Sequence, residues 1–320
     1  MDKKLISVVV PCYNESEALP YFFEALDKVI SSMQEFDFEA IYIDDGSKDE
    51  TLNIIRERAA KDCKTRYVSF SRNFGKEAGM LAGLKESKGD FVCIMDADLQ
   101  DPPALLPQMM QILTDKKCDS VATRRGNRKG EPVVRSFFAK CFYKLINRIS
   151  KIEMVPGARD YRLMTRRMVD SVLSLTEYNR FSKGIFSWVG FKTEWLCYEN
   201  VKRVAGKTKW SFWGLFKYSL ECIVAFSTAP LALSSLCGFL MFFLSVIGAI
   251  AIIIRKLVDT ASSINGWSSL ICVILFVGGL QLLCVGILGQ YLSKTYMETK
   301  NRPQYIIAET EKDNPNEEVK

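Results

Sequence analysis

The chain has 320 residues, 48% of them hydrophobic and 25% charged, and a formal net charge of +6, which accommodates one full catalytic domain and a smaller attachment. It contains no histidine, which excludes His-based zinc sites and imidazole-dependent nucleophile systems, so any general base must be a carboxylate. Its ten cysteines include no C-x-x-C pair and indicate reduced thiols in a cytosolic compartment.

The first two hundred residues alternate between short apolar segments and helical patterns. The elements expected in chain order are strand 6–10, helix 17–33, strand 39–43, helix 50–61, strand 66–70, helix 76–86, strand 91–95, helix 105–114 and strand 120–123. Because these strands are almost continuously apolar, they predict an α/β fold with a mostly parallel sheet and helices on both faces.

Two long apolar segments follow the alternating region. Leu231–Ile254 carries no charge over 24 residues and Trp267–Ser293 none over 27. At ~1.5 Å rise per residue both exceed the ~30 Å hydrocarbon core, so we predict membrane spans at 231–254 and 267–291. Lysines and arginines are concentrated before the first span and after the second, which places the catalytic domain and both termini on the cytoplasmic side of the plasma (inner) membrane.

The sequence therefore predicts four regions. These are a catalytic domain (1–200), a juxtamembrane loop and interfacial helix (201–230), a two-helix membrane hairpin (231–293) and a cytoplasmic tail (294–320) that is polar and disordered from Glu309 onward. An amphipathic pattern over 133–150 fits a second interfacial helix or a solvated surface helix.

Small residues in the second span indicate close helix contact. Gly278, Gly279, Gly286 and Gly289 line much of one helix, with Gln281 at mid-span. Such a surface packs against the first span or against a second copy, so a homo-oligomer formed through the spans is one expectation. The basic stretch 124–148 suits an anionic membrane surface or a phosphorylated substrate, and we predict no nucleic-acid partner.

Acidic residues follow three of the expected strands. Glu15 comes after the first, Asp44 and Asp45 after the second, and Asp96 and Asp98 after the fourth. Ligands of open parallel sheets bind at these strand ends. No dinucleotide fingerprint or P-loop is present, so a phosphate bound here requires a cation, and the Asp96-x-Asp98 pair offers oxygen ligands suited to Mg²⁺ or Mn²⁺. Asp45 and Asp49 are explained equally well as caps of helix 50–61.

Four motifs occur in a fixed order at these strand ends. They are V-V-V-P-C-Y-N-E (8–15), I-D-D-G-S-K-D-E-T (43–51), S-R-N-F-G (71–75) and D-A-D-L-Q-D (96–101). With them the sequence resembles the family 2 inverting glycosyltransferases of the GT-A fold, across about residues 5–200. Within that family it resembles the polyprenyl-phosphate sugar synthases, meaning dolichol-phosphate mannose synthase and, with its two C-terminal spans, the bactoprenol glucosyltransferases.

The resemblance implies roles for individual residues. The nucleobase and ribose pocket would be lined by Pro11, Tyr13, Glu15 and Asp44. The divalent metal, and through it the donor diphosphate, would be held by Asp96, Asp98 and Gln100. Asp160 would face the acceptor, Arg124 and Arg135 would grip its phosphate, and Lys207 lies in a segment similar to the mobile loop that closes over the donor.

The implied reaction moves a hexose, with inversion, from a nucleotide-sugar to undecaprenyl or another polyprenyl phosphate for cell-envelope glycosylation. UDP-glucose is the first expectation for the donor, with GDP-mannose and UDP-N-acetylhexosamine as alternatives. A phosphate monoester has a second pKa near ~6 and is already largely anionic at neutral pH, so Asp160 is expected to position groups rather than to remove a proton.

Three other classes of protein compete with this one. A lipid-carrier flippase is disfavoured because two spans offer little pathway through the bilayer. A processive polysaccharide synthase requires a Q-x-x-R-W motif and further spans, and neither is evident. A non-catalytic membrane scaffold or sensor would be favoured by loss of one acid from the D-x-D pair, but Asp96 and Asp98 are both present.

Overall fold

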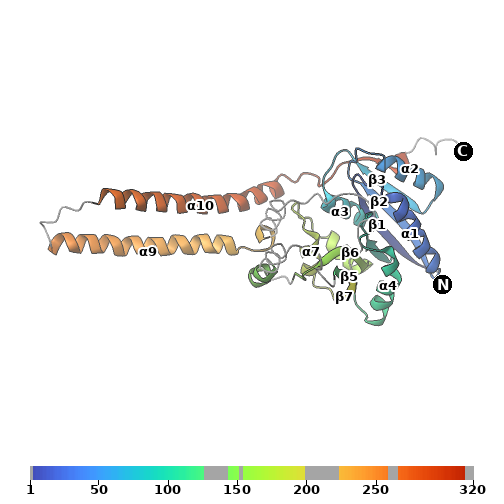
Figure 1. The fold of residues 1–320 in the computed structure, drawn as a ribbon, viewed down its shortest axis with the longest axis horizontal. Helices are drawn as coiled ribbons and strands as arrows, with labels where there is room; N and C mark the ends of the chain where they lie inside the picture. Colours follow the sequence, from blue (N-terminus) through green and yellow to red (C-terminus); the bar gives the residue numbers. More distant parts are fainter. Residues whose placement is uncertain (1–2, 126–142, 151–153, 199–222, 259–265, 314–320) are drawn as a thin grey trace.

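The computed structural model describes residues 3–125, 143–150, 154–198, 223–258 and 266–313. They form one eight-stranded sheet, in the order β7-β5-β6-β4-β1-β2-β3-β8, and two long helices that run side by side away from it (Figure 1). The strands are β1 (Lys4–Cys12), β2 (Phe36–Asp44), β3 (Thr65–Phe70), β4 (Phe91–Ile94), β5 (Ser120–Arg125), β6 (Ala158–Thr165), β7 (Thr193–Tyr198) and β8 (Ile307–Thr310).

The sheet is mostly parallel, as the apolar strands predicted. β1 pairs in parallel with β2 and β4, β2 with β3, and β5 with β7, while β6 and β8 are antiparallel to their neighbours. In the part of the chain that the structure describes, the helices flanking the sheet are α1 (Leu19–Ser32), α2 (Thr51–Lys61), α3 (Lys76–Glu86), α4 (Leu106–Asp115), α6 (Arg166–Leu173) and α7 (Ser182–Trp188). The predicted α/β class is therefore confirmed.

Alternating side chains of β1 build a core on each face of the sheet. Val8 and Val10 belong to the cluster that includes α1, α2 and α4, whereas Val9 belongs to the cluster of α3, α6 and α7. On the second face α3 lies very close to the sheet, because a Cβ at Gly83 would be 2.1 Å from a methyl carbon of Val9. In the first turn of α3, a Cβ at Gly79 would be 3.3 Å from Cβ of Pro11, so this turn also lies close to the end of β1.

The two long helices are α9 (Ala229–Val258) and α10 (Trp267–Thr299). Both are long and apolar enough to cross a membrane, and large apolar side chains such as Phe239 and Leu282 are exposed on them. The glycines of α10 do not pack closely against α9, since a Cβ added at Gly278, Gly279, Gly286 or Gly289 meets nothing within 4 Å. Close packing between the two spans thus does not account for these glycines, and self-association stays a prediction.

The C-terminal tail differs from the expectation. Ile307–Thr310 form β8, an antiparallel edge strand on β3, so the chain is ordered past Glu309 rather than disordered from that point. Arg56 binds the Glu309 carboxylate through two nitrogens, and Tyr305 stacks on Phe70 with ring centroids 4.9 Å apart. The charged residues of the tail did not indicate disorder correctly, because its acids form ion pairs with arginines of α2 and β3.

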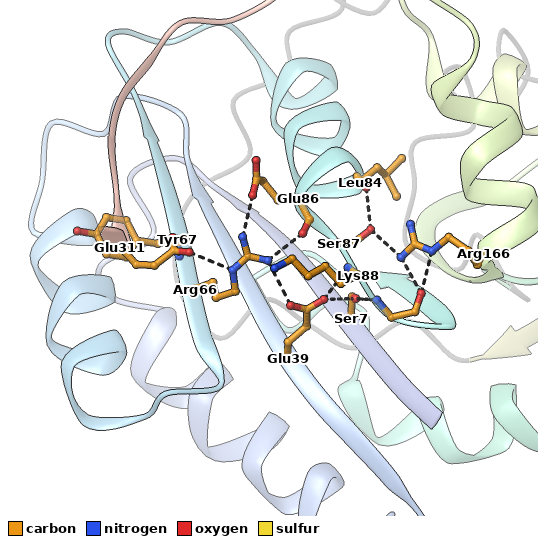
Figure 2. Close-up of polar contacts among 11 residues, drawn as sticks. Ser7, Glu39, Arg66, Tyr67, Leu84, Glu86, Ser87, Lys88, Arg166 and Glu311 are labelled. Carbon is orange, nitrogen blue, oxygen red and sulfur yellow. Dashed lines mark hydrogen bonds and ion pairs between the residues drawn. The ribbon is translucent and has the colours of Figure 1, made fainter. Parts of the chain in front are cut away.

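A polar network joins Glu311, the residue after β8, to the interior of the sheet near the starts of β1 and β3 (Figure 2). Arg66 on β3 contacts Glu311 at 3.0 Å, Glu86 at 2.7 Å and the buried Glu39 at 3.3 Å. Glu39 also accepts hydrogen bonds from the Ser7 hydroxyl and the Lys88 N–H. A buried carboxylate is tolerated where it is paired and hydrogen-bonded in this way.

Candidate active site

The sheet register brings the predicted acids to one edge. Cys12 pairs with Asp44 and Asp44 with Ser69, so β1, β2 and β3 end level with one another. Val9 pairs with Ile94, which places the D-A-D-L-Q-D segment after β4 at the same edge. The side chains that follow these strands therefore surround one region at their carboxyl ends, where ligands of such sheets bind.

Asp44 and Asp45 shape the loops of this edge. The buried Asp44 accepts hydrogen bonds from the Ser47 N–H and the Ser69 hydroxyl. Asp45 accepts the N–H groups of Phe74 and Gly75, and so fixes the residues that lead into α3. The alternative that Asp45 caps helix 50–61 is wrong for this reason, whereas Asp49 does accept the N–H of Thr51, the first residue of α2.

The loop after β2 and the loop before α3 approach each other closely at Gly46. Gly46 has φ of +64°, and a Cβ there would be 2.5 Å from the carbonyl carbon of Arg72. Both the backbone conformation and the space require glycine at this position. The I-D-D-G-S and S-R-N-F-G motifs are thus parts of one packed unit.

Asp160 lies beside Asp96 because β6 runs antiparallel to β4. The pairing of Ile94 with Arg162, continued by two residues, sets Asp160 opposite Asp96. The Lys76 ammonium, at the first position of α3, lies between them. Its Nζ is 2.6 Å from Asp96 Oδ1, 2.8 Å from Asp96 Oδ2 and 2.6 Å from Asp160 Oδ2.

These ion pairs set the charge state of the cluster. Burial acts to lower the pKa of Lys76, but Asp160 and then Asp96 outweigh it, and the pKa of Lys76 lies well above its ordinary value. Burial acts to raise the pKa of Asp160, but Lys76 and then Lys183, whose Nζ is 3.8 Å away, outweigh it and hold that pKa far below its usual range. Asp160 is therefore an anion at neutral pH and a weak proton acceptor.

The D-A-D-L-Q-D segment is held from its other side by β6 and β7. The Gln100 N–H donates to Asp98 Oδ1 at 3.0 Å, and the backbone turns at Leu99 with φ of 57°. Arg159 donates to Gln100 Oε1 at 3.0 Å and to the buried Asp101 at 2.9 Å. The Tyr198 hydroxyl also donates to Asp101. Asp101 is thus an anchor for the turn that presents Asp96 and Asp98.

The chemistry of this site suits a divalent cation that binds together with a phosphate ligand. Among the described residues, no three His, Cys, Asp or Glu side chains gather closely enough to form a metal site by themselves. Mg²⁺ commonly uses one or two carboxylates and completes its shell with substrate phosphates and water. In the structure the Lys76 ammonium binds Asp96, which shows that this position accommodates a positive charge.

The other predicted site residues divide into three groups. Pro11, Tyr13 and Glu15 are partly buried at and beyond the end of β1, on the same edge as Asp44. Arg124 pairs in register with Ala158, two residues from Asp160, and its Nε donates to Cys197 Sγ at 2.8 Å. Arg135, Lys207 and the interfacial segment 211–218 lie outside the described residues. The roles of all of these stay predictions.

A cavity of 480 Å³ lies next to the cluster, between the start of α3, the loop 178–181 and α10. Three of its lining side chains are cationic: Arg72, Arg180 and Lys294. Glu298 of α10 accepts the N–H groups of Tyr178 and Asn179, and Lys294 donates to the Asn179 side chain at 3.0 Å. The end of α10 is thus fastened to a loop beside the acidic edge.

Sequence reasoning missed Lys76, Arg159 and Tyr198. Lys76 directly follows the S-R-N-F-G motif, and that position at the start of a predicted helix was the available signal. Arg159 adjoins Asp160, but only the unpredicted strand β6 shows that it reaches back to Asp101. Nothing in the local sequence connects Tyr198 with Asp101, because that contact depends on the position of β7.

Glu77 provides a pH-dependent test of this region. Its carboxylate accepts the Ser182 N–H at 2.9 Å and the Ser182 hydroxyl. Burial raises the pKa of Glu77 above its ordinary value, and the bonds from Ser182 oppose that only in part. Because the pKa of Glu77 is raised in the folded state, the contribution of protonated Glu77 to the stability of the fold is complete below the unfolded-state pKa of about 4.3. That contribution is lost as the pH rises through the folded-state pKa.

We therefore expect the melting temperature of Glu77→Gln, relative to that of the wild type, to increase as the pH is raised from about 4 to 7. Thermal unfolding in detergent at several pH values measures this difference, with Glu57→Gln, an acid of α2 far from Ser182, as the matched control. A Glu77→Gln difference that stays constant over this range contradicts the assignment.

Comparison with known proteins gives a consistent result. Residues 7–173 match the sequence profile of Glycosyl transferase family 2. The chain is 42% identical to CsbB of Bacillus subtilis over 309 residues, which are 97% of this chain and 93% of that protein. It is 39% identical over 310 residues to the SfII prophage-derived bactoprenol glucosyl transferase of Shigella flexneri, covering 97% of this chain and 99% of that one.

Solved structures show more distant likeness. Mannosyl-3-phosphoglycerate synthase from Rubrobacter xylanophilus is similar with a TM-score of 0.47 and 16% identity, over 69% of this chain and 72% of that chain. Glucosyl-3-phosphoglycerate synthase from Mycobacterium tuberculosis, crystallised with Mn²⁺, UDP and glucosyl-3-phosphoglycerate, is similar with a TM-score of 0.43 and 21% identity, over 69% and 78%.

Proposed function

Because the chain belongs to glycosyl transferase family 2 and is a glycosyltransferase, we propose that it moves a hexose from a nucleotide-sugar to a polyprenyl phosphate at a membrane surface. The observation that carries the proposal is the meeting of Asp96 and Asp160 around Lys76, at the strand ends and beside the end of α10. The name of the Shigella relative supports a bactoprenol-type acceptor and glucose as the sugar, and UDP-glucose is the donor to test first.

In this proposal the chain's own residues bind and orient two anionic substrates. Asp96 and Asp98, with Gln100, would hold Mg²⁺ or Mn²⁺, which supplies positive charge to the donor diphosphate. Asp45 fixes the loop before α3 and Asp101 fixes the turn that carries Asp98, so both sides of the site are positioned before substrate binds. Asp44, Glu15 and Tyr13, on the same edge, would contact the nucleoside.

Asp160 would act as a positioning group in an inverting transfer. Its pKa is held far below its usual range by Lys76 and Lys183, although burial opposes this, so it accepts a proton poorly. The acceptor phosphate needs no strong base because it is already largely anionic near pH 7. Arg180 and Lys294 in the cavity beside α10, together with Arg124, would offset the repulsion between acceptor and donor.

The two apolar helices support a location in the membrane. We place the catalytic domain and both termini on the cytoplasmic side of the plasma (inner) membrane, because the positive charges flank the hairpin at its outer ends. α10 then leads directly from the bilayer to the acidic edge. A lipid phosphate diffusing in the bilayer would meet the site at this junction.

Membranes that contain the protein test the proposal. We expect radiolabelled UDP-glucose and Mn²⁺ or Mg²⁺ to give a product that extracts into organic solvent, depends on added polyprenyl phosphate and releases glucose on mild acid treatment. UDP-N-acetylglucosamine and GDP-mannose serve as competing donors. Absence of lipid-linked label with all three donors would contradict the proposed acceptor, and transfer to an added protein or glycan instead would replace it.

A further inference from the structure

Lys76 touches both carboxylates of the site but has no role in the proposed metal or substrate contacts. Its ammonium contacts both oxygens of Asp96, at 2.6 and 2.8 Å, and one oxygen of Asp160 at 2.6 Å. Both oxygens of Asp96 are therefore in contact with the ammonium. Each oxygen has a second lone pair, but repulsion between the two cations favours displacement of Lys76 when a metal binds Asp96.

The position of Lys76 in α3 indicates a purpose other than helix stability. A cation in the first turn of a helix opposes the helix dipole, which favours acids there. The loop before Lys76 is pinned by Asp45, and the helix itself lies against Val9 at Gly83, so the lysine backbone has little freedom to move. Only the flexible side chain can leave Asp96, and Asp160 can retain it.

We propose that Lys76 is a tethered cation that competes with the divalent metal for Asp96, a device that rests on the proposed metal-dependent transfer. Without metal, the ammonium neutralises Asp96 and Asp160 together. When the metal takes Asp96, repulsion by its double charge moves the ammonium away from Asp96, and the ion pair with Asp160 persists. The hydrogen-bond donors released from Asp96 then face the region in which the phosphate groups bind.

The proposed competition is tested by measuring the affinity of the protein for metal, because a loss of activity alone would not identify the role of Lys76. We expect Lys76→Met to bind Mn²⁺ about two- to fivefold more tightly than the wild type in the presence of UDP, as loss of a competing ion pair predicts. Mn²⁺ binding to the full-length protein in detergent is measured by the loss of the free-ion EPR signal. Lys76→Gln gives the same readout with a side chain closer in polarity, should the Met variant fold poorly.

Lys183→Met is the matched control. Lys183 also lies near Asp160, at 3.8 Å, but no ion pair joins it to Asp96 among the described residues, so its removal tests the general effect of one positive charge. Equal tightening in the Lys183 and Lys76 variants, or none in the latter, overturns the competition. Asp98→Ala separates the two proposals: if it abolishes Mn²⁺–UDP binding while Lys76→Met leaves affinity unchanged, the metal assignment stands and the role of Lys76 falls. If wild type and Asp98→Ala bind Mn²⁺ equally, both fall.

Discussion

Asp98→Ala is expected to lower kcat/KM for lipid-linked sugar formation by about 100- to 1000-fold. A bound divalent ion contributes several kcal/mol to stabilising charge on a departing diphosphate, and each ~1.4 kcal/mol corresponds to a factor of ten in rate. Asp98 lies in the turn that Arg159 and Tyr198 fasten through Asp101, so alanine removes the proposed metal ligand without releasing that anchor.

The measurement is steady-state transfer of labelled sugar at increasing Mn²⁺ concentrations. Asp115→Ala, which removes an exposed acid at the end of α4, is the matched control and is expected to leave transfer unchanged. Equal melting temperatures of the two variants would show that the loss is not one of folding. Near-native transfer by Asp98→Ala, with its Mn²⁺ dependence retained, would contradict the assignment of the D-x-D pair.

The parallel half of the sheet was predictable because its signals are local. The strands from β1 to β4 are short, largely buried segments followed by a turn or an acid, and α1 and α2 between them each carry an apolar face, whereas α3 is buried along most of its length. Successive strands of this kind bring their carboxyl ends to one edge, so Asp44 and Asp96 could be assigned to one site from their order alone.

The antiparallel strands could not be predicted in the same way. β6 contains Arg159, Asp160 and Arg162, three charged residues within a strand whose burial comes from β4 and β5 on either side. Arg162 is 3% exposed and lies over the ring of Phe186, which no local pattern indicates. The neighbouring position of Asp96 and Asp160 is a consequence of this register, and so is the place of Lys76 between them.

Strand β8 escaped prediction for a different reason. It has four residues, and its partner β3 lies more than two hundred positions earlier in the chain. Its acids read as solvated when taken alone, yet Glu309 meets Arg56 and Tyr67, and Glu311 meets Arg66. Whether a charged tail is ordered therefore depends on the basic side chains of the edge strand and helix beside it, which the sequence of the tail does not show.

Ending the chain at Pro303 is expected to lower the melting temperature by about 5–10 °C. The truncation removes β8 and leaves Arg56 and Arg66 without Glu309 and Glu311. Charge-assisted hydrogen bonds contribute about 1.5–3 kcal/mol each, and because the Arg56–Glu309 pair is partly exposed to solvent we take about 2.5 kcal/mol for the two together. A loss of 1 kcal/mol lowers the melting temperature of a domain of this size by ~2–4 °C. Exposed β3 would also be open to pairing with other chains, so aggregation on heating should increase.

Transfer activity should fall with the same truncation, because β8 pairs with the end of β3 that leads toward the site. The Ser71 N–H donates to the Ile306 carbonyl at 3.0 Å, and Tyr305 packs on Phe70, so the tail supports the loop that leads into Lys76. A chain that ends at Asp313 keeps every one of these contacts and is the matched control. Glu309→Gln with Glu311→Gln, in the full chain, should give an intermediate melting temperature. If both truncated chains melt together with the wild type, β8 does not stabilise the catalytic domain, and its contacts with Arg56 and Arg66 contribute nothing measurable.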